Sequence, residues 1–149
     1  MMVLAAVPVL AGCSANPPEH RGPAVTAETA KQKMIDAVDT VTGRLGGTWT
    51  PRTGPDYAES CELETGDEGA NWVYLTGRAD GGDPEPDAAA TRHLWKSQGM
   101  TVERWADPDG PAIVGRGGDS VDSISLYAFP GNYTVQAVSL CFRGDADRL

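Results

Sequence analysis

The sequence is poor in basic residues and in histidine, and each shortage excludes a class of function. Only 12 side chains are Lys or Arg against 21 that are Asp or Glu, which gives 149 residues a formal net charge of −9. Proteins that bind nucleic acids gain much of their affinity from basic side chains that neutralise phosphates, so we expect no nucleic-acid partner. The two histidines are His20, in a proline-rich stretch, and His93, on the outward face of a predicted helix. Since G-x-S-x-G is also missing, a Ser-His-acid triad is not supported.

The N-terminal apolar run is too short to cross a membrane. Residues 1–12 carry no side-chain charge. As a helix they would span about 18 Å, against a hydrocarbon core of roughly 30 Å. This length is typical of the apolar region of a signal peptide. No Lys or Arg precedes the run as it should in a signal peptide, so we expect a translation start upstream or a shortened sequence.

Small residues lead from this run to a cysteine. The segment Leu10-Ala11-Gly12-Cys13 has Leu three positions before the cysteine and small residues between them. It resembles the lipobox of bacterial lipoproteins. The resemblance implies cleavage before Cys13, a diacylglycerol on its sulfur, and often an acyl chain such as palmitate on the new amino terminus. Two acyl chains anchor a protein stably, so we expect a protein held by lipid at the outer face of the cell membrane. An ordinary secretory signal or a buried apolar N-terminus is the alternative.

Three cysteines are an odd number, which needs an explanation in an exported protein. Lipidation of Cys13 leaves Cys61 and Cys141, and outside the cytoplasm we expect such a pair to be oxidised. The predicted disulfide closes a loop of about 80 residues and contributes at most roughly 4.5 kcal/mol from chain entropy. Metal binding is the alternative, but the chain has no C-x-x-C and no His close in sequence to either cysteine.

The chain divides into three parts. Residues 1–12 are the predicted signal peptide, and residues 13–25 comprise the lipidated cysteine and a flexible, proline-rich tether. The tether reaches at most about 40 Å from the membrane. Residues 26–149 are predicted to form a single extracytoplasmic domain, since 40% of the chain is hydrophobic and can supply a core.

Two amphipathic helices are predicted from their periodicity and end signals. The first is capped by Thr26 and runs to about Leu45, where two glycines stop it. The second has Asp83 as N-cap, Pro84 at its first position and Gly99 after its end. Each places apolar residues on one face. The predicted inward face of the second helix holds Ala88, Thr91, Leu94, Trp95 and Gln98.

Alternating apolar and polar residues predict strands over most of the rest. The predicted strands are residues 57–64, 71–77, 100–106, 112–115, 121–129 and 133–142, whereas residues 49–55 are predicted as a loop and 115–118 as a turn. The order is helix, two strands, helix, four strands. It predicts an α+β fold with two helices packed on one face of an antiparallel sheet of about five to six strands, and one disulfide.

A second resemblance rests on segments of this domain. Residues 94–102, Leu-Trp-Lys-Ser-Gln-Gly-Met-Thr-Val, carry a helix straight into a strand, and a late strand pair ends in Ser139-Leu140-Cys141. Together with the lipobox, these segments resemble the small exported lipoproteins of actinobacteria, mostly of unassigned function. Nine Arg against three Lys agree with a GC-rich genome. The resemblance covers nearly the whole chain and implies no particular activity.

Four carboxylates lie at the close spacing that calcium favours: Asp80, Asp83, Glu85 and Asp87. The residue order of an EF-hand is missing, so we predict no metal and no cofactor.

Two other pairs of carboxylates also have a simpler interpretation than a site. Asp107 and Asp109 favour a solvated turn. Glu62 and Glu64 are predicted to share one face of a strand and would be the pair of a carboxylate-based hydrolase. A solvent-facing polar row is the better interpretation of this pair, and we expect no enzyme.

Among the aromatic residues, Trp49 is the predicted contact, because it lies on a Gly/Pro-rich loop and is the least obviously buried tryptophan. We therefore expect a non-enzymatic binding or interaction module at the cell envelope, with an envelope protein or a small ligand as partner. Such a module should expose an apolar patch near Trp49 or the turns. The alternative is a carrier of a small apolar ligand between helices and sheet, which needs an enclosed cavity of about 300 Å³.

Overall fold

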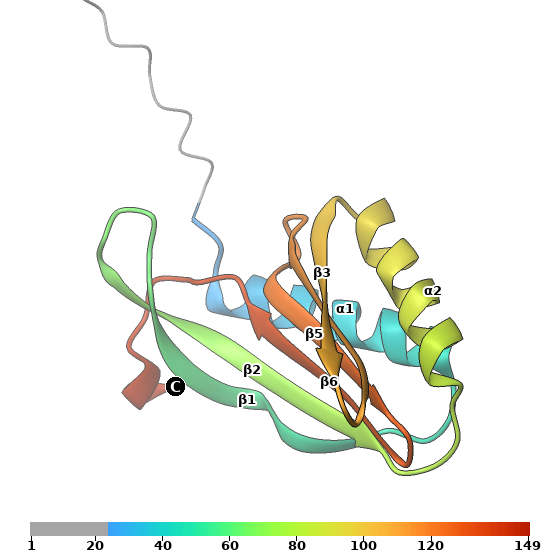
Figure 1. The fold of residues 1–149 in the computed structure, drawn as a ribbon. Helices are drawn as coiled ribbons and strands as arrows, with labels where there is room; N and C mark the ends of the chain where they lie inside the picture. The colour runs from blue at the N-terminus through green and yellow to red at the C-terminus, as the bar shows by residue number, and fades with distance from the viewer. Residues whose placement is uncertain (1–23) are drawn as a thin grey trace, which may run out of the picture.

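The computed structural model describes residues 24–149, so the predicted lipobox with Cys13, His20 and most of the tether lie outside the described residues. The described chain forms α1 (Ala27–Leu45), β1 (Thr50–Glu62), β2 (Glu68–Arg78), α2 (Pro84–Ser97), β3 (Met100–Asp107), β4 (Gly110–Gly117), β5 (Val121–Phe129), β6 (Asn132–Ser139) and the 3-10 helix η1 (Ala146–Arg148) (Figure 1). The six strands make one antiparallel sheet in the order β1-β2-β6-β5-β4-β3. The predicted α+β fold is confirmed. Neither helix of this part of the chain has the length and apolar character that a membrane span requires.

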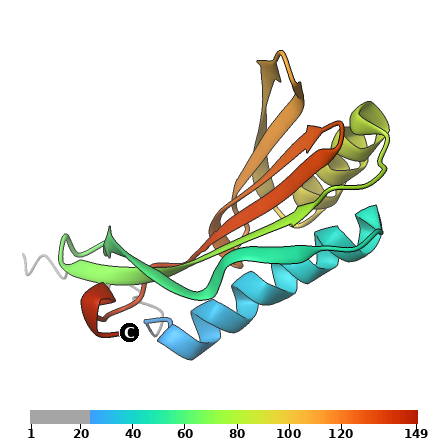
Figure 2. The same ribbon diagram turned by 90° about the horizontal axis from the view of Figure 1, so that it is seen from below.

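Both helices lie on one side of the strongly curved sheet (Figure 2). α1 packs on β2, β5 and β6, and α2 packs on β3, β4 and β5, so one continuous core fills the space between helices and sheet. Alternate residues of β5 enter this core, as predicted: Ile124, Leu126 and Ala128 are 1% exposed or less. The opposite face of the sheet is covered by neither helix, and we call it the open face.

The helix ends follow the predicted signals, with two differences at α2. Asp83 occupies the N-cap position, but its side chain makes no capping hydrogen bond. Pro84 and Pro86 have no N–H to be capped, and the carboxylate of Asp87 instead accepts the Asp83 N–H at 3.0 Å. The inward face was predicted to include Gln98, but this residue ends the helix and is exposed.

Strand β1 corrects the prediction of a loop over residues 49–55. It begins at Thr50 and includes Pro51 and Pro55. Proline cannot donate to a ladder and is tolerated in edge strands or at bulges. β1 is an edge strand, and its register with β2 shifts on both sides of Thr53. The two prolines therefore fit an irregular edge strand. From residues 49–55 alone, such a strand cannot be distinguished from a loop.

The turn predicted over residues 115–118 begins later than predicted, because β4 extends to Gly117. Gly115 lies on the helix side of the sheet, where a Cβ atom would approach Trp95 Cε3 to 3.2 Å and Met100 Sδ to 3.0 Å. This glycine therefore serves the close packing of α2 on the sheet and belongs to the strand.

Candidate functional site

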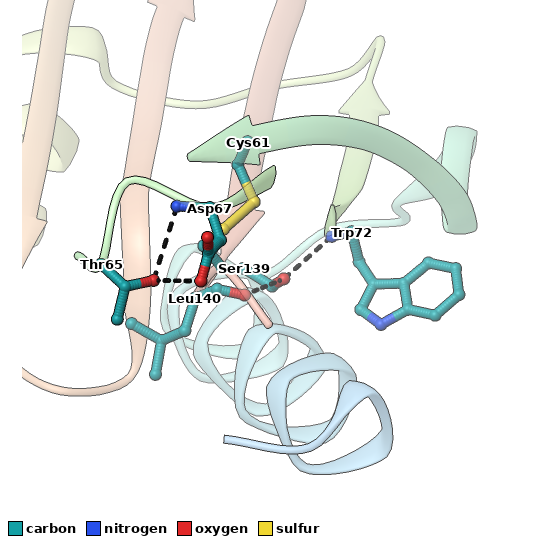
Figure 3. Close-up of a disulfide and its surroundings, with 7 residues drawn as sticks. Cys61, Thr65, Asp67, Trp72, Ser139 and Leu140 are labelled. Atoms are coloured by element: carbon teal, nitrogen blue, oxygen red, sulfur yellow. Dashed lines mark hydrogen bonds between the residues drawn. A yellow bond between two sulfur atoms is a disulfide. The ribbon is translucent and has the colours of Figure 1, made fainter. Parts of the chain in front are cut away.

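The predicted disulfide is present and joins β1 to the segment that follows β6. Cys61 and Cys141 are bonded with an S–S distance of 2.05 Å and a Cα–Cα distance of 6.1 Å (Figure 3). Gly69 is paired with Cys61 in the sheet, and a Cβ atom there would lie 2.9 Å from Cys141 Sγ. The missing side chain leaves room for the disulfide to pass over β2, so the bond fastens the edge of the sheet to the C-terminal segment.

The chain around the disulfide has a structural role. β6 was predicted to reach residue 142 but ends at Ser139, and beyond it the chain makes a single bridge between Phe142 and Ala70. At this point the backbone N–H of Trp72 donates to Ser139 Oγ at 2.9 Å, and that hydroxyl donates to the Leu140 carbonyl at 2.9 Å (Figure 3). A side chain thus replaces the missing strand partner of the Trp72 N–H.

A buried arginine organises the opposite end of the sheet. Arg78, the last residue of β2, is 4% exposed. Its Nη1 donates to the carbonyls of Leu45 at 2.9 Å and Gly46 at 2.6 Å, and its Nε donates to the Asp80 carbonyl at 2.7 Å. The first two are free carbonyls at the C-terminus of α1, where the helix dipole favours a cation. We call this residue, its ring partners Trp49 and Tyr133, and the acidic Asp80 and Asp87 around them the Arg78 cluster.

Two residues of the acidic stretch, Asp80 and Asp87, contact Arg78 and Tyr133 in this cluster. The phenol of Tyr133 donates to Asp87 Oδ2 at 2.8 Å, and Arg78 Nε lies 3.8 Å from Asp80 Oδ1. Burial of the Tyr133 phenol and then its hydrogen bond to Asp87 raise the pKa of Tyr133. The Arg78 guanidinium lies beside these groups, 4.9 Å from the Tyr133 ring centre. Through these contacts the cluster joins the end of α1, the start of α2 and the sheet.

Trp49, the predicted contact residue, belongs to the same cluster. It is half-buried, its indole N–H donates to the Gly46 carbonyl at 2.8 Å, and the Arg78 guanidinium carbon lies 5.7 Å from its ring centre. These contacts give Trp49 a packing role at the end of α1. Its role as a contact for a partner stays a prediction.

The other predicted candidates lie apart from one another. Glu62 ends β1 and Glu64 lies in the following turn, so the prediction that both share a strand face is wrong, because the strand is shorter than its polar alternation suggests. His93 is exposed on the outer side of α2, as predicted. Asp107 accepts the backbone N–H of Asp109 at 2.9 Å, which confirms the predicted turn.

A pocket lies between the two helices, lined mainly by Val41, Leu45, Thr91 and Leu94. Its cavity volume is about 40 Å³. Sites for small organic ligands have volumes of about 300 Å³ or more. This pocket is therefore too small for the apolar ligand of the carrier hypothesis.

The open face carries the large exposed aromatic residues of the described chain. Tyr57 on β1 is 48% exposed and Trp105 on β3 is 43% exposed, and these strands are the two edges of the sheet. Alternation places Trp105 opposite to its neighbour Arg104, whose Nη2 donates to Glu85 Oε1 of α2 at 2.7 Å. The same alternation places Tyr57 on the open face, because its partner Val73 lies between two residues that face α1.

Trp105 is part of an aromatic patch that extends over β3, β4 and β5. It pairs with Ala112, which pairs with Tyr127, and the Tyr127 and Phe129 rings meet edge to face with centres 5.5 Å apart. Ala112 is only 1% exposed although no helix covers it, so neighbouring side chains on the open face shield it. We call Trp105, Ala112, Tyr127 and Phe129 the Trp105 patch.

The Trp105 patch was not predicted from the sequence, although the sequence contains a signal for it. In the predicted strand 100–106, Trp105 lies on the same side as Glu103 and on the opposite side from Val102. Asp107, one residue past the predicted end of the strand, is on the side of Trp105 as well. A tryptophan in the polar phase of a strand is exposed unless another layer covers it. Placing it on an uncovered face also required the strand order.

Comparison with known proteins shows the fold. No protein-family model matches the chain, and none of the curated proteins matches it. Among solved structures, the chain is similar to a DUF4853 family protein from Actinomyces odontolyticus, with a TM-score of 0.56, 14% identity, and coverage of 84% of this chain and 72% of that one. At this identity the similarity shows a shared fold. That protein comes from an actinobacterium, the group to which the sequence resemblance pointed.

Proposed function

We propose that this protein is a non-enzymatic binding module, anchored by lipid at the outer face of the cell membrane, that holds a partner on the open face of its sheet. The observation that carries the proposal is the contrast between a helix-covered face filled by the core and an open face with the exposed Trp105 patch. Exposed aromatic residues grouped on a rigid surface are typical anchors of binding sites.

The anchor rests on the resemblance of residues 10–13 to a lipobox. Two features support it. The Cys61–Cys141 disulfide is typical of proteins that fold outside the cytoplasm. The net charge of −9 would be repelled by anionic headgroups, so an acyl anchor is needed to hold the domain at such a surface.

The proposal is tested in intact cells with a photo-crosslinking side chain at position 101 or, as a control, at position 89. Thr101 is exposed and lies on the same side of β3 as Trp105, which stays in place, and Ala89 is exposed on the outer side of α2. We expect a crosslinked partner from position 101 and none from position 89. Crosslinking from position 89 alone would place the binding surface on the helices and contradict the proposal.

The anchor is tested by cell fractionation. The unaltered chain is expected in the membrane fraction, and Cys13→Ala is expected in the soluble fraction because no acyl chain can be attached. Membrane residence of the Cys13→Ala chain would refute lipid anchoring, whatever the crosslinking shows.

A further inference from the structure

The two edges of the sheet differ in how well they can accept another strand. β1 contains Pro51 and Pro55 and two shifts of register. β3 contains no proline and keeps an unshifted register with β4 from Met100 to Asp107. Within residues 24–149 no strand pairs with the outer side of β3. Exposed, regular edges are the sites at which extended peptides add a strand, whereas prolines and bulges block such pairing.

Trp105 lies on this open edge. The rings of Trp72 and Trp49 each have a basic side chain of the protein beside them, and the Trp105 ring has none in the described part of the chain. Lys31 Nζ lies 3.8 Å from the ring centre of Trp72, and Arg78 lies beside Trp49. Trp95 is 1% exposed and fills the core. In the described part of the chain, Trp105 alone among the tryptophans combines high exposure with no cation of the protein's own over its ring.

The surroundings of Trp105 favour a positive charge. Glu103 and Asp107 lie two residues before and after it in β3, hence on the same side of the strand, and both are exposed. An aromatic face flanked by carboxylates attracts a Lys or Arg side chain. The net charge of −9 adds a long-range attraction for a basic partner. A second copy of this chain is disfavoured, because pairing β3 with β3 would bring acidic residues together.

We infer that the outer edge of β3 and the Trp105 patch bind an extended basic segment of a partner protein. The segment pairs with β3 as an added strand, and one of its Lys or Arg side chains lies over Trp105 between Glu103 and Asp107. This inference rests on the proposed binding function and names the chemistry of the partner.

The test uses the full chain carrying Cys13→Ala and measures fluorescence anisotropy of a labelled peptide of alternating Lys and Val. Two matched peptides serve as controls, one with Glu in place of Lys and one with N-methyl groups on alternate backbone nitrogens. We expect the first control to bind at least about tenfold more weakly, because it loses the charge attraction. The second should bind more weakly because it cannot form the strand ladder on one side.

Variants of the protein locate the site. Trp105→Ala should weaken binding of the Lys-Val peptide about tenfold, and Trp105→Phe should weaken it less, because Phe keeps a smaller aromatic face. Glu103→Gln should weaken binding and reduce its dependence on salt. Tyr57→Ala is the matched control, since Tyr57 is as exposed as Trp105 but lies on the irregular edge, and it should leave binding unchanged. A urea titration of each variant shows that it is folded.

Three results would overturn the inference. These are equal binding of the Lys and Glu peptides, undiminished binding by folded Trp105→Ala, and Trp105-dependent binding of an uncharged oligosaccharide in place of the peptide. The proposed function fails separately. If position 101 still crosslinks a partner in cells while the basic peptide does not bind, the binding face stands and the basic segment is wrong.

Discussion

Between the helices and the sheet, Trp95 of α2, Arg78 of β2 and Tyr133 of β6 are 1%, 4% and 0% exposed. On the open face, Trp105 is 43% exposed and Arg52 is exposed over Gly77. The same types of residue thus occur in opposite surroundings on two sides of one sheet. On the covered face each has partners within the chain, such as the carbonyls that Arg78 binds. We conclude that the covered face supplies stability and that the open face is available for binding.

The tryptophans should show the largest difference. Trp95→Ala is expected to lower the free energy of unfolding by about 3–5 kcal/mol, because it leaves a cavity between α2 and the sheet. Trp105→Ala is expected to lower it by about 1 kcal/mol or less, because much of this ring is already in water. Urea denaturation measures both. A larger loss from Trp105→Ala than from Trp95→Ala would reverse the assignment of the two faces.

The arginines should show a smaller but clear difference. Arg78→Ala removes the side-chain donor of the Leu45 carbonyl and one of the two donors of the Gly46 carbonyl, and is expected to cost about 3 kcal/mol in urea denaturation. Arg78→Lys should lose less stability than Arg78→Ala but should remain less stable than the unaltered chain, since one ammonium group cannot reproduce the fork of a guanidinium. Arg52, whose Nη2 donates to exposed Asn132 at 3.0 Å, is the matched control. Arg52→Ala should change stability by about 0.5 kcal/mol or less, and equal losses at the two positions would argue against the Arg78 cluster.

The tyrosines should differ in how stability depends on pH. Burial and the hydrogen bond to Asp87 raise the pKa of Tyr133 above its ordinary value of 10.0. Above pH 10.0 the unfolded chain therefore loses a proton that the folded chain keeps, so this contribution to stability is complete below that pH and is lost as the pH rises further. Tyr133→Phe should reduce the alkaline loss of stability, measured by thermal unfolding from pH 8 to 11, and Tyr127→Phe should retain it. An unchanged alkaline limb in Tyr133→Phe would contradict the structure.

The smallest effect is expected at the boundary between the faces, in the exposed ion pair of Glu85 and Arg104. The hydrogen bond from Arg104 lowers the pKa of Glu85 below 4.5. The pair therefore adds a little stability above pH 4.5, which is lost as the pH falls through the lowered pKa. Glu85→Gln should remove this dependence and change stability at pH 7 only slightly, because both side chains are in water. Thermal unfolding at pH 3 and pH 7 checks this, and a large loss at pH 7 would show that α2 depends on the pair.

The elements that could be predicted from the sequence have local signals. α1 has a capping Thr26, whose Oγ1 accepts the Thr29 N–H at 3.1 Å, and a left-handed Gly46 with φ 68° at its end. β5 alternates from Ile124 to Ala128, and the prediction gave both its bounds. The disulfide followed from counting thiols once Cys13 was assigned to lipid. Each of these signals lies within a few residues or in the composition.

The features that were missed depend on contacts between distant segments. Pro51 fits a strand only because β1 is at the edge of the sheet. Arg78 can be buried only because the fold brings the end of α1 to the end of β2, 33 residues later in sequence. Trp105 is a binding candidate because it lies in the polar phase of β3 and because the helices cover the other face of the sheet. Local periodicity gives the first of these facts, but it does not give the order of the strands or the position of the helices.

The most direct measurement of the central claim is hydroxyl-radical footprinting of the unaltered chain in native membranes and in purified form. The two exposed aromatic residues on the sheet provide their own comparison. We predict that oxidation of Trp105 falls in native membranes, where a partner covers it, while oxidation of Tyr57 is the same in both preparations. Equal oxidation of Trp105 in both, or protection of Tyr57 instead, would contradict the assignment of the Trp105 patch as the binding surface.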